Sequence, residues 1–413
     1  MRAFLNLPKR LFAAVSVLFL LFSCSRDAVT FVGREKLFSL DYGRFENEID
    51  LFQLDFGSNG PDTQIFMKDG MFYITNSGGK KILQLTSFGD LLSVFYNPEH
   101  NPEPSFARSV DADSAQIESA DSTRKAISYP FNHPVFLCVD NLKRLSVVDQ
   151  VPPERMEYDS VSQVALKNVV LRFSSDGKFL DWIGQEGPGG SPFPPVAALH
   201  TNNKNELIVL SRSQNSLIVY WYSVDGNLLF RVPVSYRNLP GPYDSQSQVF
   251  SSLEKIVPSF TDRTLYLKID YYIPVIDQST GANAGISFDK SCVYPFLIDE
   301  GAYGSRIDLP AYTEVEQGKL GTTQFRKPYE LLGVTASGWF FLSTPSSDGY
   351  TIEMMDVKSG RIISRTLQIQ NEELAYNAMA LSPDGILSAL LATPWQSSVV
   401  WWRTDALIGE IRR

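Results

Sequence analysis

Short apolar runs separated by turn residues recur along the chain from residue 31 onward. The runs Ile65–Lys68 and Met71–Asn76 are rich in β-branched and aromatic residues and surround the pair Asp69-Gly70, a pattern typical of a β-hairpin. No segment after residue 30 shows the apolar spacing of an amphipathic helix longer than about three turns. The pattern therefore predicts an all-β fold.

The strand-turn-strand unit repeats. A hairpin around Asp176-Gly177 occurs again around Asp225-Gly226, 49 residues later (225 − 176). Further copies include Trp339–Leu342 and Ala378–Leu381. A recurring antiparallel unit of this length indicates a ring or stack of small sheets. We expect six such units, at residues 60–97, 131–183, 193–232, 253–309, 329–369 and 374–404.

The segment from Phe173 to Phe230 combines two Asp-Gly hairpins, an Ile183-Gly184-x-x-Gly187 linker and Phe193-Pro194-Pro195. It resembles the NHL repeat of six-bladed β-propellers. The chain after residue 23 is similar to spirochaetal lipoproteins with an NHL- or TolB-like propeller. The resemblance implies one six-bladed β-propeller over residues 31–413. Residues 31–56 are expected to supply the strand that closes the ring with the last blade.

The N-terminus has the pattern of a lipoprotein signal peptide. Arg2, Lys9 and Arg10 precede the uncharged run 11–22, which suits a signal-peptide core and is short for a bilayer span. Leu21-Phe22-Ser23-Cys24 resembles a bacterial lipobox of the relaxed, spirochaetal kind, which implies cleavage after Ser23 and acylation of Cys24. The expected organisation is a signal peptide at 1–23, an acylated tether at 24–30 and the propeller at 31–413. An ordinary cleaved signal peptide and a retained transmembrane anchor remain alternatives.

Two segments are predicted to interrupt the propeller. Residues 97–128 are rich in Ser, Asp and Glu and poor in large apolar residues, so we expect a mobile insertion. Residues 151–167 interrupt the second blade, and Pro152-Pro153 forces an extended exit from the preceding strand. Such insertions serve as binding loops or as solvated spacers.

Composition narrows the chemistry. Lys and Arg total 37 against 46 Asp and Glu, a net charge of −9, which argues against a nucleic-acid partner. The chain has three histidines and three cysteines, too few for a disulfide framework or a Cys-rich zinc module. We expect Cys138 and Cys292 to be buried free thiols, although a disulfide between them stays open.

No catalytic or metal-binding motif is found in the sequence. His200 follows the Phe193-Pro194-Pro195 segment and is interpreted as a structural histidine. Asp140, Asn202 and Asp299 are candidate ligands of a central metal, but no motif connects them. We therefore expect no catalytic residue, no cofactor and no metal site, and the only assigned functional residue is Cys24.

Three functions remain open at this point. The favoured one is a non-catalytic protein-interaction scaffold, anchored to a membrane of the cell envelope through acylated Cys24. The second is a metal-dependent lactonase or hydrolase of the six-bladed propeller type. The third is a lipoprotein that binds a small ligand or a carbohydrate.

Overall fold

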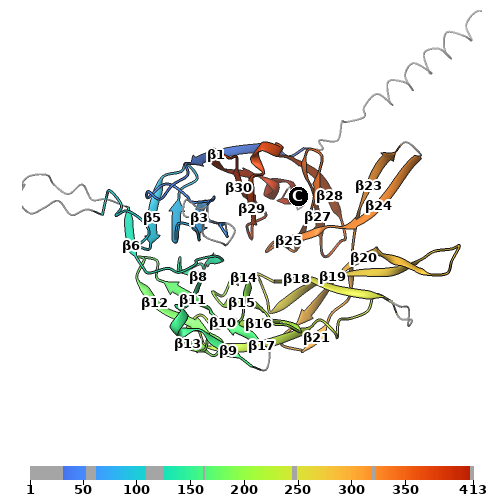
Figure 1. Ribbon diagram of the computed structural model, residues 1–413, viewed down its shortest axis with the longest axis horizontal. Helices are drawn as coiled ribbons and strands as arrows, with labels where there is room; N and C mark the ends of the chain where they lie inside the picture. Colours follow the sequence, from blue (N-terminus) through green and yellow to red (C-terminus); the bar gives the residue numbers. More distant parts are fainter. Residues whose placement is uncertain are drawn as a thin grey trace, which may run out of the picture.

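Six sheets, antiparallel except for one parallel pair at the outer edge of the first, surround a central channel in the computed structural model (Figure 1). The structure describes residues 31–52, 62–107, 124–160, 163–243, 249–318 and 321–409. The predicted all-β, six-bladed β-propeller is confirmed, and each predicted repeat coincides with one blade. The predicted signal peptide and Cys24 lie outside the described residues. No helix in the described part of the chain is long and apolar enough to cross a membrane.

In the first three blades the strands follow the chain order from the channel outward, and in the second blade a separate hairpin, formed by residues 157–159 and 164–166, interrupts that order. The first contains β2 (Gln64–Lys68), β3 (Met71–Asn76), β4 (Lys81–Leu85), β5 (Leu91–Tyr96) and β6 (Lys125–Ser128). The second contains β7 (Leu137–Val139), β8 (Leu145–Gln150), β11 (Asn168–Phe173), β12 (Phe179–Gly184) and β13 (Gly187–Pro188). The third contains β14 (Val196–Thr201), β15 (Leu207–Arg212), β16 (Ser216–Tyr222) and β17 (Leu228–Ser235).

The last three blades follow the same plan with longer strands in the fourth. The fourth contains β18 (Phe250–Pro258), β19 (Thr264–Ile276), β20 (Asn283–Leu297), β21 (Ala302–Tyr303) and β22 (Ile307–Leu309). The fifth contains β25 (Glu330–Val334), β26 (Trp339–Ser346), β27 (Gly349–Asp356) and β28 (Ile362–Gln368). The sixth contains β29 (Tyr376–Leu381), β30 (Leu387–Ala392), β31 (Ser397–Trp402) and β1 (Arg34–Leu40). The short helix η2 (Asn371–Glu373) precedes β29, and α2 (Thr404–Gly409) follows β31.

The ring is closed by its two ends. Strand β1 pairs antiparallel with β31, with Arg34 opposite Trp402 and Leu40 opposite Ser397, as predicted for residues 31–56. The sixth blade thereby combines strands from both ends of the described chain and leaves no gap at the closure point. In the described part of that segment after β1, residues 41–52, no strand forms, and Ile49 makes an isolated bridge to Tyr42.

The hairpins form where the sequence carries a residue pair suited to a tight turn. Asp69 and Gly70 both have positive φ angles, 50° and 75°, between β2 and β3. This backbone matches the right-handed twist of a hairpin, and Asp-Gly tolerates it well. The predicted Asp-Gly hairpin is thus confirmed.

The hydrophobic core lies between neighbouring blades rather than inside one of them. Tyr73 and Ile82 of the first blade pack against Leu137 and Val147 of the second in one buried cluster. Equivalent clusters join the other blades. Each sheet therefore buries both faces, which explains why the strands are almost continuously apolar.

The predicted insertions contain some regular structure. Within 97–128, the last four residues form β6. This strand adds to the first blade parallel to β5, with Ile127 opposite Phe95. Residues 108–123 lie outside the described residues. Within 151–167, Pro152 is extended, and η1 (Pro153–Arg155) and the hairpin β9 (Glu157–Asp159) and β10 (Val164–Leu166) follow.

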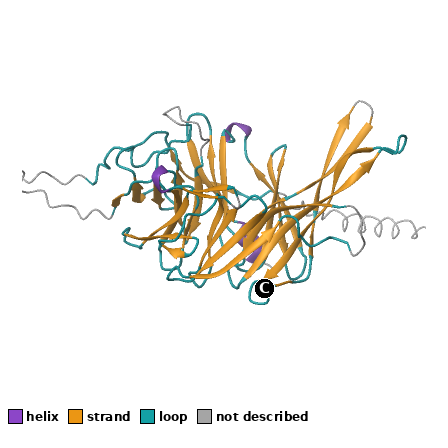
Figure 2. Ribbon diagram, turned by 60° about the horizontal axis from the view of Figure 1, so that its bottom comes forward, coloured by secondary structure: helices purple, strands orange, loops and turns teal. Residues whose placement is uncertain are grey.

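Two long hairpins that the sequence did not predict project from the ring (Figure 2). One is the outer half of β19 and β20, and the other is formed by β23 (Ala311–Gly318) and β24 (Gly321–Pro328). They lie beside each other between the fourth and fifth blades.

Candidate functional site

The central channel is lined by alternate residues of the innermost strands. In β2, Gln64, Phe66 and Lys68 face the channel, whereas Ile65 and Met67 pack into the core between blades. This is the two-residue period of a strand with one face toward the core and the other toward the channel. In β25 and β29 the larger side chains follow the same period, while the small residues Gly333 and Ala380 between them also border the channel.

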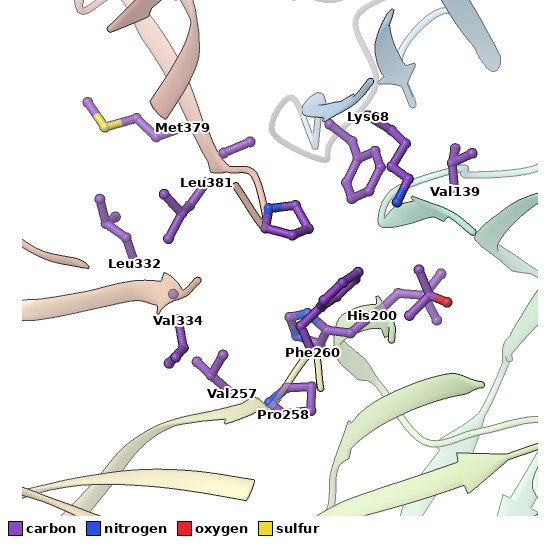
Figure 3. A pocket seen from close by; sticks show the side chains of 16 residues that line it. Lys68, Val139, His200, Val257, Pro258, Phe260, Leu332, Val334, Met379 and Leu381 are labelled. Carbon is purple, nitrogen blue, oxygen red and sulfur yellow. The ribbon is translucent and has the colours of Figure 1, made fainter. Parts of the chain in front are cut away.

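Two cavities occupy the channel, and Leu332, Met379 and Leu381 border both of them. The first, called the apolar chamber here, has a volume of about 210 Å³ and lies toward the carboxyl ends of the innermost strands (Figure 3). The second has a volume of about 270 Å³ and lies toward their amino ends, with Gln64 and Lys255 among its polar lining. The channel thus has one apolar and one polar half.

Lys68 is the charged residue of the apolar chamber. Its Nζ donates a hydrogen bond to Asn141 Oδ1 at 2.7 Å and lies 5.6 Å from the centroid of the Phe260 ring. Among the described residues, no carboxylate lies within 4.0 Å of this ammonium group. The neighbouring Asp69 instead pairs with Lys143.

His200 extends from β14 toward the centre of the chamber (Figure 3). Burial, and secondarily the nearby Lys255 ammonium, lowers the pKa of His200 to about 4. The imidazole is therefore neutral at pH 7. Its Nε2 has no hydrogen-bond partner, and neither does Oγ1 of the adjacent Thr201. The sequence interpretation of a satisfied structural histidine therefore needs correction, since one ring nitrogen is left unpaired.

Lys255 lies in the polar half of the channel. Its Nζ donates to the carbonyl oxygen of Leu332 at 3.2 Å. Burial lowers the pKa of Lys255, and the Glu330 carboxylate opposes that shift. The Glu330 charge faces the polar cavity and not the apolar chamber.

Asp140, Asn202 and Asp299, the candidate metal ligands from the sequence, do not come together in the channel. Asp140 accepts hydrogen bonds in the turn after β7, from the backbone N–H groups of Leu142 and Arg144. Asn202 caps the turn after β14 in the same way, and Asp299 lies near Arg263 in the turn after β20. No group of three or more His, Cys, Asp or Glu side chains is placed to hold a metal within the described residues.

Cys138 and Cys292 are free and buried, so the interpretation as buried thiols is confirmed. Burial raises the pKa of both thiols, to about 12 for Cys292. Neither is a reactive thiolate.

Sequence reasoning missed Lys68 and Lys255 as channel residues. The only signal that could have found them is a charged side chain at an alternate position of an otherwise apolar innermost strand. Such a charge must reach water, a partner or a cavity.

The second candidate surface is the apolar ribbon, defined as Tyr272–Ile276 of β19 and Asn283–Phe288 of β20. Ile276 is 53% exposed and Ile286 58%. Ile273 and Val275 are exposed as well. Pro274 lies opposite Ile286 in the strand register. Strand β18 reaches the ribbon only where Phe250 lies opposite Tyr272, and among the described strands no other pairs with Ile273–Ile276 or Asn283–Phe288 on an outer edge.

The adjacent charged ribbon, defined as Ala311–Glu314 of β23 and Phe325–Pro328 of β24, has a different surface. Lys327 Nζ lies 2.8 Å from Glu314 Oε2 and 5.2 Å from the centroid of the Tyr312 ring. Its partners are therefore found within the hairpin itself, although Phe325 is exposed.

The fold and channel define this chain as a six-bladed β-propeller. No protein-family model matches it, and no similar sequence is found among curated proteins. Among solved structures it is similar to the polysaccharide lyase Uly1, with 9% identity, a TM-score of 0.42 and coverage of 90% of this chain and 99% of that one.

Two further solved structures are similar at the same level. A polysaccharide lyase described as an ulvan lyase has 10% identity, a TM-score of 0.37 and coverage of 89% and 84%. A gluconolactonase from Xanthomonas campestris has 11% identity, a TM-score of 0.36 and coverage of 80% and 82%. Likenesses at this level carry no argument about activity.

Proposed function

We propose that this protein is a membrane-anchored lipoprotein whose propeller is a non-catalytic protein-interaction scaffold in the cell envelope. The lipobox ending in Cys24 supports the anchor. Phe31 follows seven residues later (31 − 24) and bridges to Thr366 of the fifth blade. At no more than about 3.5 Å per residue, the tether holds this part of the rim within about 25 Å of the bilayer.

The apolar ribbon is the observation that carries the scaffold role. Between Tyr272 and Phe288 the only charged residue is Asp277 at the turn. An isolated two-stranded ribbon with exposed aliphatic side chains is marginally stable in water, and its open edges invite pairing with another strand. A bound partner would cover both the side chains and the edges.

The partner is a protein strand rather than the bilayer. The tip, residues 277–282, is polar, and Asp277 Oδ1 accepts hydrogen bonds from Ser279 and Thr280 at the turn. Insertion tip-first into a bilayer would bury these groups before the isoleucines behind them. Lateral addition of an extended strand from an envelope protein leaves the tip in water and uses the free ribbon edge.

The anchor is tested by Cys24→Ser. We expect the acylated protein to enter the detergent phase of a Triton X-114 separation and the variant to stay in the aqueous phase, because only the acyl chains provide the affinity. The mass of the N-terminal peptide gives an independent readout. A variant that still enters the detergent phase contradicts the anchor.

The scaffold role is tested by Ile276→Asp together with Ile286→Asp, with Thr313→Asp on the charged ribbon as the matched control. An envelope protein captured by the wild type should be identified, purified and titrated against all three proteins. We expect it to bind the wild type and the control but to lose at least about tenfold in affinity for the double variant. Thermal melts check that the variants fold.

Two other outcomes would point elsewhere. Equal binding of all three proteins contradicts docking at the apolar ribbon. If the double variant instead loses binding to protein-free vesicles, the ribbon contacts the bilayer. For the hydrolase alternative, one equivalent of retained calcium or zinc with an activity lost on chelation would contradict the non-catalytic proposal.

A further inference from the structure

We infer that the apolar chamber of the channel is a binding site for a small monocarboxylate with an apolar body, held by Lys68. This inference is independent of the anchor and of the ribbon, because the chamber lies inside the ring. It follows from the size of the chamber, the chemistry of its wall and its charge.

The size of the chamber limits the ligand. At about 210 Å³ it exceeds the roughly 150 Å³ of an apolar cavity that holds a benzene molecule. It is smaller than the roughly 300–1,000 Å³ typical of pockets for drug-sized ligands. A single six-membered ring or a short acyl chain fits, whereas a sugar polymer or a peptide segment does not.

The wall of the chamber favours an apolar body. Figure 3 shows side chains from several blades around one space, and most of the sixteen lining residues are aliphatic, aromatic or proline. Phe66 and Phe260 provide aromatic faces, while Val334 and Leu381 provide aliphatic ones. Transfer of apolar ligand surface into such a space is favourable.

The charge of the chamber favours an anion. Lys68 is positive, His200 is neutral at pH 7, and none of the sixteen lining residues is acidic. The Lys68 ammonium has three donors, and its hydrogen bond to Asn141 uses one. A ligand carboxylate at this position would pair with the ammonium group through charge-assisted hydrogen bonds, which are stronger than those between neutral groups.

The unpaired Nε2 of His200 is a second, independent sign of a polar ligand group. A buried ring nitrogen without a partner is unfavourable, and a ligand that supplies one recovers that loss. The neutral imidazole carries no charge of its own, so the sign of the ligand charge is set by Lys68 in the chamber wall and by the nearby Lys255 ammonium, and both favour an anion.

The test is a titration of the purified full chain with sodium benzoate and sodium hexanoate, followed by calorimetry and by the methyl NMR signal of Met379. We expect both acids to bind with a Kd below about 1 mM and to shift the Met379 signal. Benzyl alcohol, which keeps the ring and lacks the charge, should bind at least about tenfold more weakly.

Lys68→Met keeps the apolar stem and removes the charge, and it should weaken benzoate at least about tenfold while leaving benzyl alcohol unchanged. Lys178→Met is the matched control, since the Lys178 side chain is 81% exposed on a turn of the second blade. Val334→Phe fills the chamber and should abolish binding of both compounds. Three results would each overturn the inference. They are no binding of either acid at about 10 mM, equal affinity for the acid and the alcohol, and a benzoate affinity of Lys68→Met equal to that of the wild type.

Discussion

Strands β19 and β20 pass from one environment into another along their length. Their inner half, where Ile269 pairs with Cys292, is buried between blades, and both side chains have no exposed surface. Their outer half is the apolar ribbon, where Ile276 and Ile286 are more than half exposed. The same residue types therefore stabilise the fold in one half and are available to a partner in the other.

The two halves also treat charge differently. In the inner half, Lys268 and Asp270 are almost completely buried, and Lys268 Nζ donates to both carboxylate oxygens of Asp270 at 2.7 Å. Burial raises the pKa of Asp270, and the Lys268 ammonium opposes that shift. The ribbon excludes charge except at its tip. A partner for it must therefore be recognised by shape and backbone hydrogen bonds rather than by charge.

The comparison is tested most strongly by truncating one isoleucine in each half. Ile269→Ala should destabilise the protein by about 2–5 kcal/mol, because it leaves a cavity in a packed core. Ile276→Ala should change the free energy of unfolding by less than about 0.5 kcal/mol, because its side chain is mostly in water already. Chemical denaturation of both variants measures the difference, and similar losses would show that the ribbon is part of the core.

The sequence predicts the blades but not this division. Asp69-Gly70 and Asp225-Gly226 are local signals, since the turn conformation depends on those residues themselves. Ile269 and Ile276 look alike in sequence, because both lie in one run of β-branched and aromatic residues. Which of them is buried depends on where the neighbouring blade ends, and that is a property of the assembled ring. The two predicted insertions do not include the outer half of β19 and β20 or the hairpin of β23 and β24, which are ordered strands.

The channel was predicted in part for a similar reason. Phe66, Val334 and Met379 lie in apolar innermost strands and line the channel, as the alternation along a strand allows. The environment of His200 could not be predicted, because its burial comes from residues of other blades and its lost partner is visible only in three dimensions. Alternation places a side chain on a face, but it does not say what the opposite blades contribute.

The second prediction uses pH to separate the channel from the apolar ribbon. The pKa of His200 is about 4 in the fold against 6.5 when unperturbed, so the unfolded chain binds more protons between these values. Stability should be fully present above about pH 6.5 and should fall by up to about 3 kcal/mol as the pH drops toward 4. Denaturation midpoints from pH 4 to 7 measure this, and His200→Gln should flatten that part of the profile.

Binding at the apolar ribbon should not follow that profile. Its charged residue, Asp277, has a pKa lowered to about 2, chiefly by the Ser279 hydroxyl, and therefore stays ionised throughout this range. We expect partner affinity to be constant between about pH 5.5 and 7.5, where the fold is intact. An affinity that falls in parallel with stability would show that the apolar ribbon is not independent of the channel around His200.

The smallest effect is expected on the charged ribbon, which resembles the apolar ribbon in shape and differs in surface. Glu314 and Lys327 form an ion pair, but both side chains are more than one third exposed. Exposed pairs contribute about 0.2–1 kcal/mol and are screened by salt, so Lys327→Met should lower stability by no more than about 1 kcal/mol and less in high salt. A double-mutant cycle with Glu314→Gln measures the coupling free energy of the pair. A coupling above about 2 kcal/mol, twice the upper end of the usual range, would show that the pair is held more rigidly than its exposure implies. The affinity for the partner should be unchanged in the two single variants and the double variant, because Lys327 and Glu314 are paired with each other within the charged ribbon and lie outside the apolar ribbon.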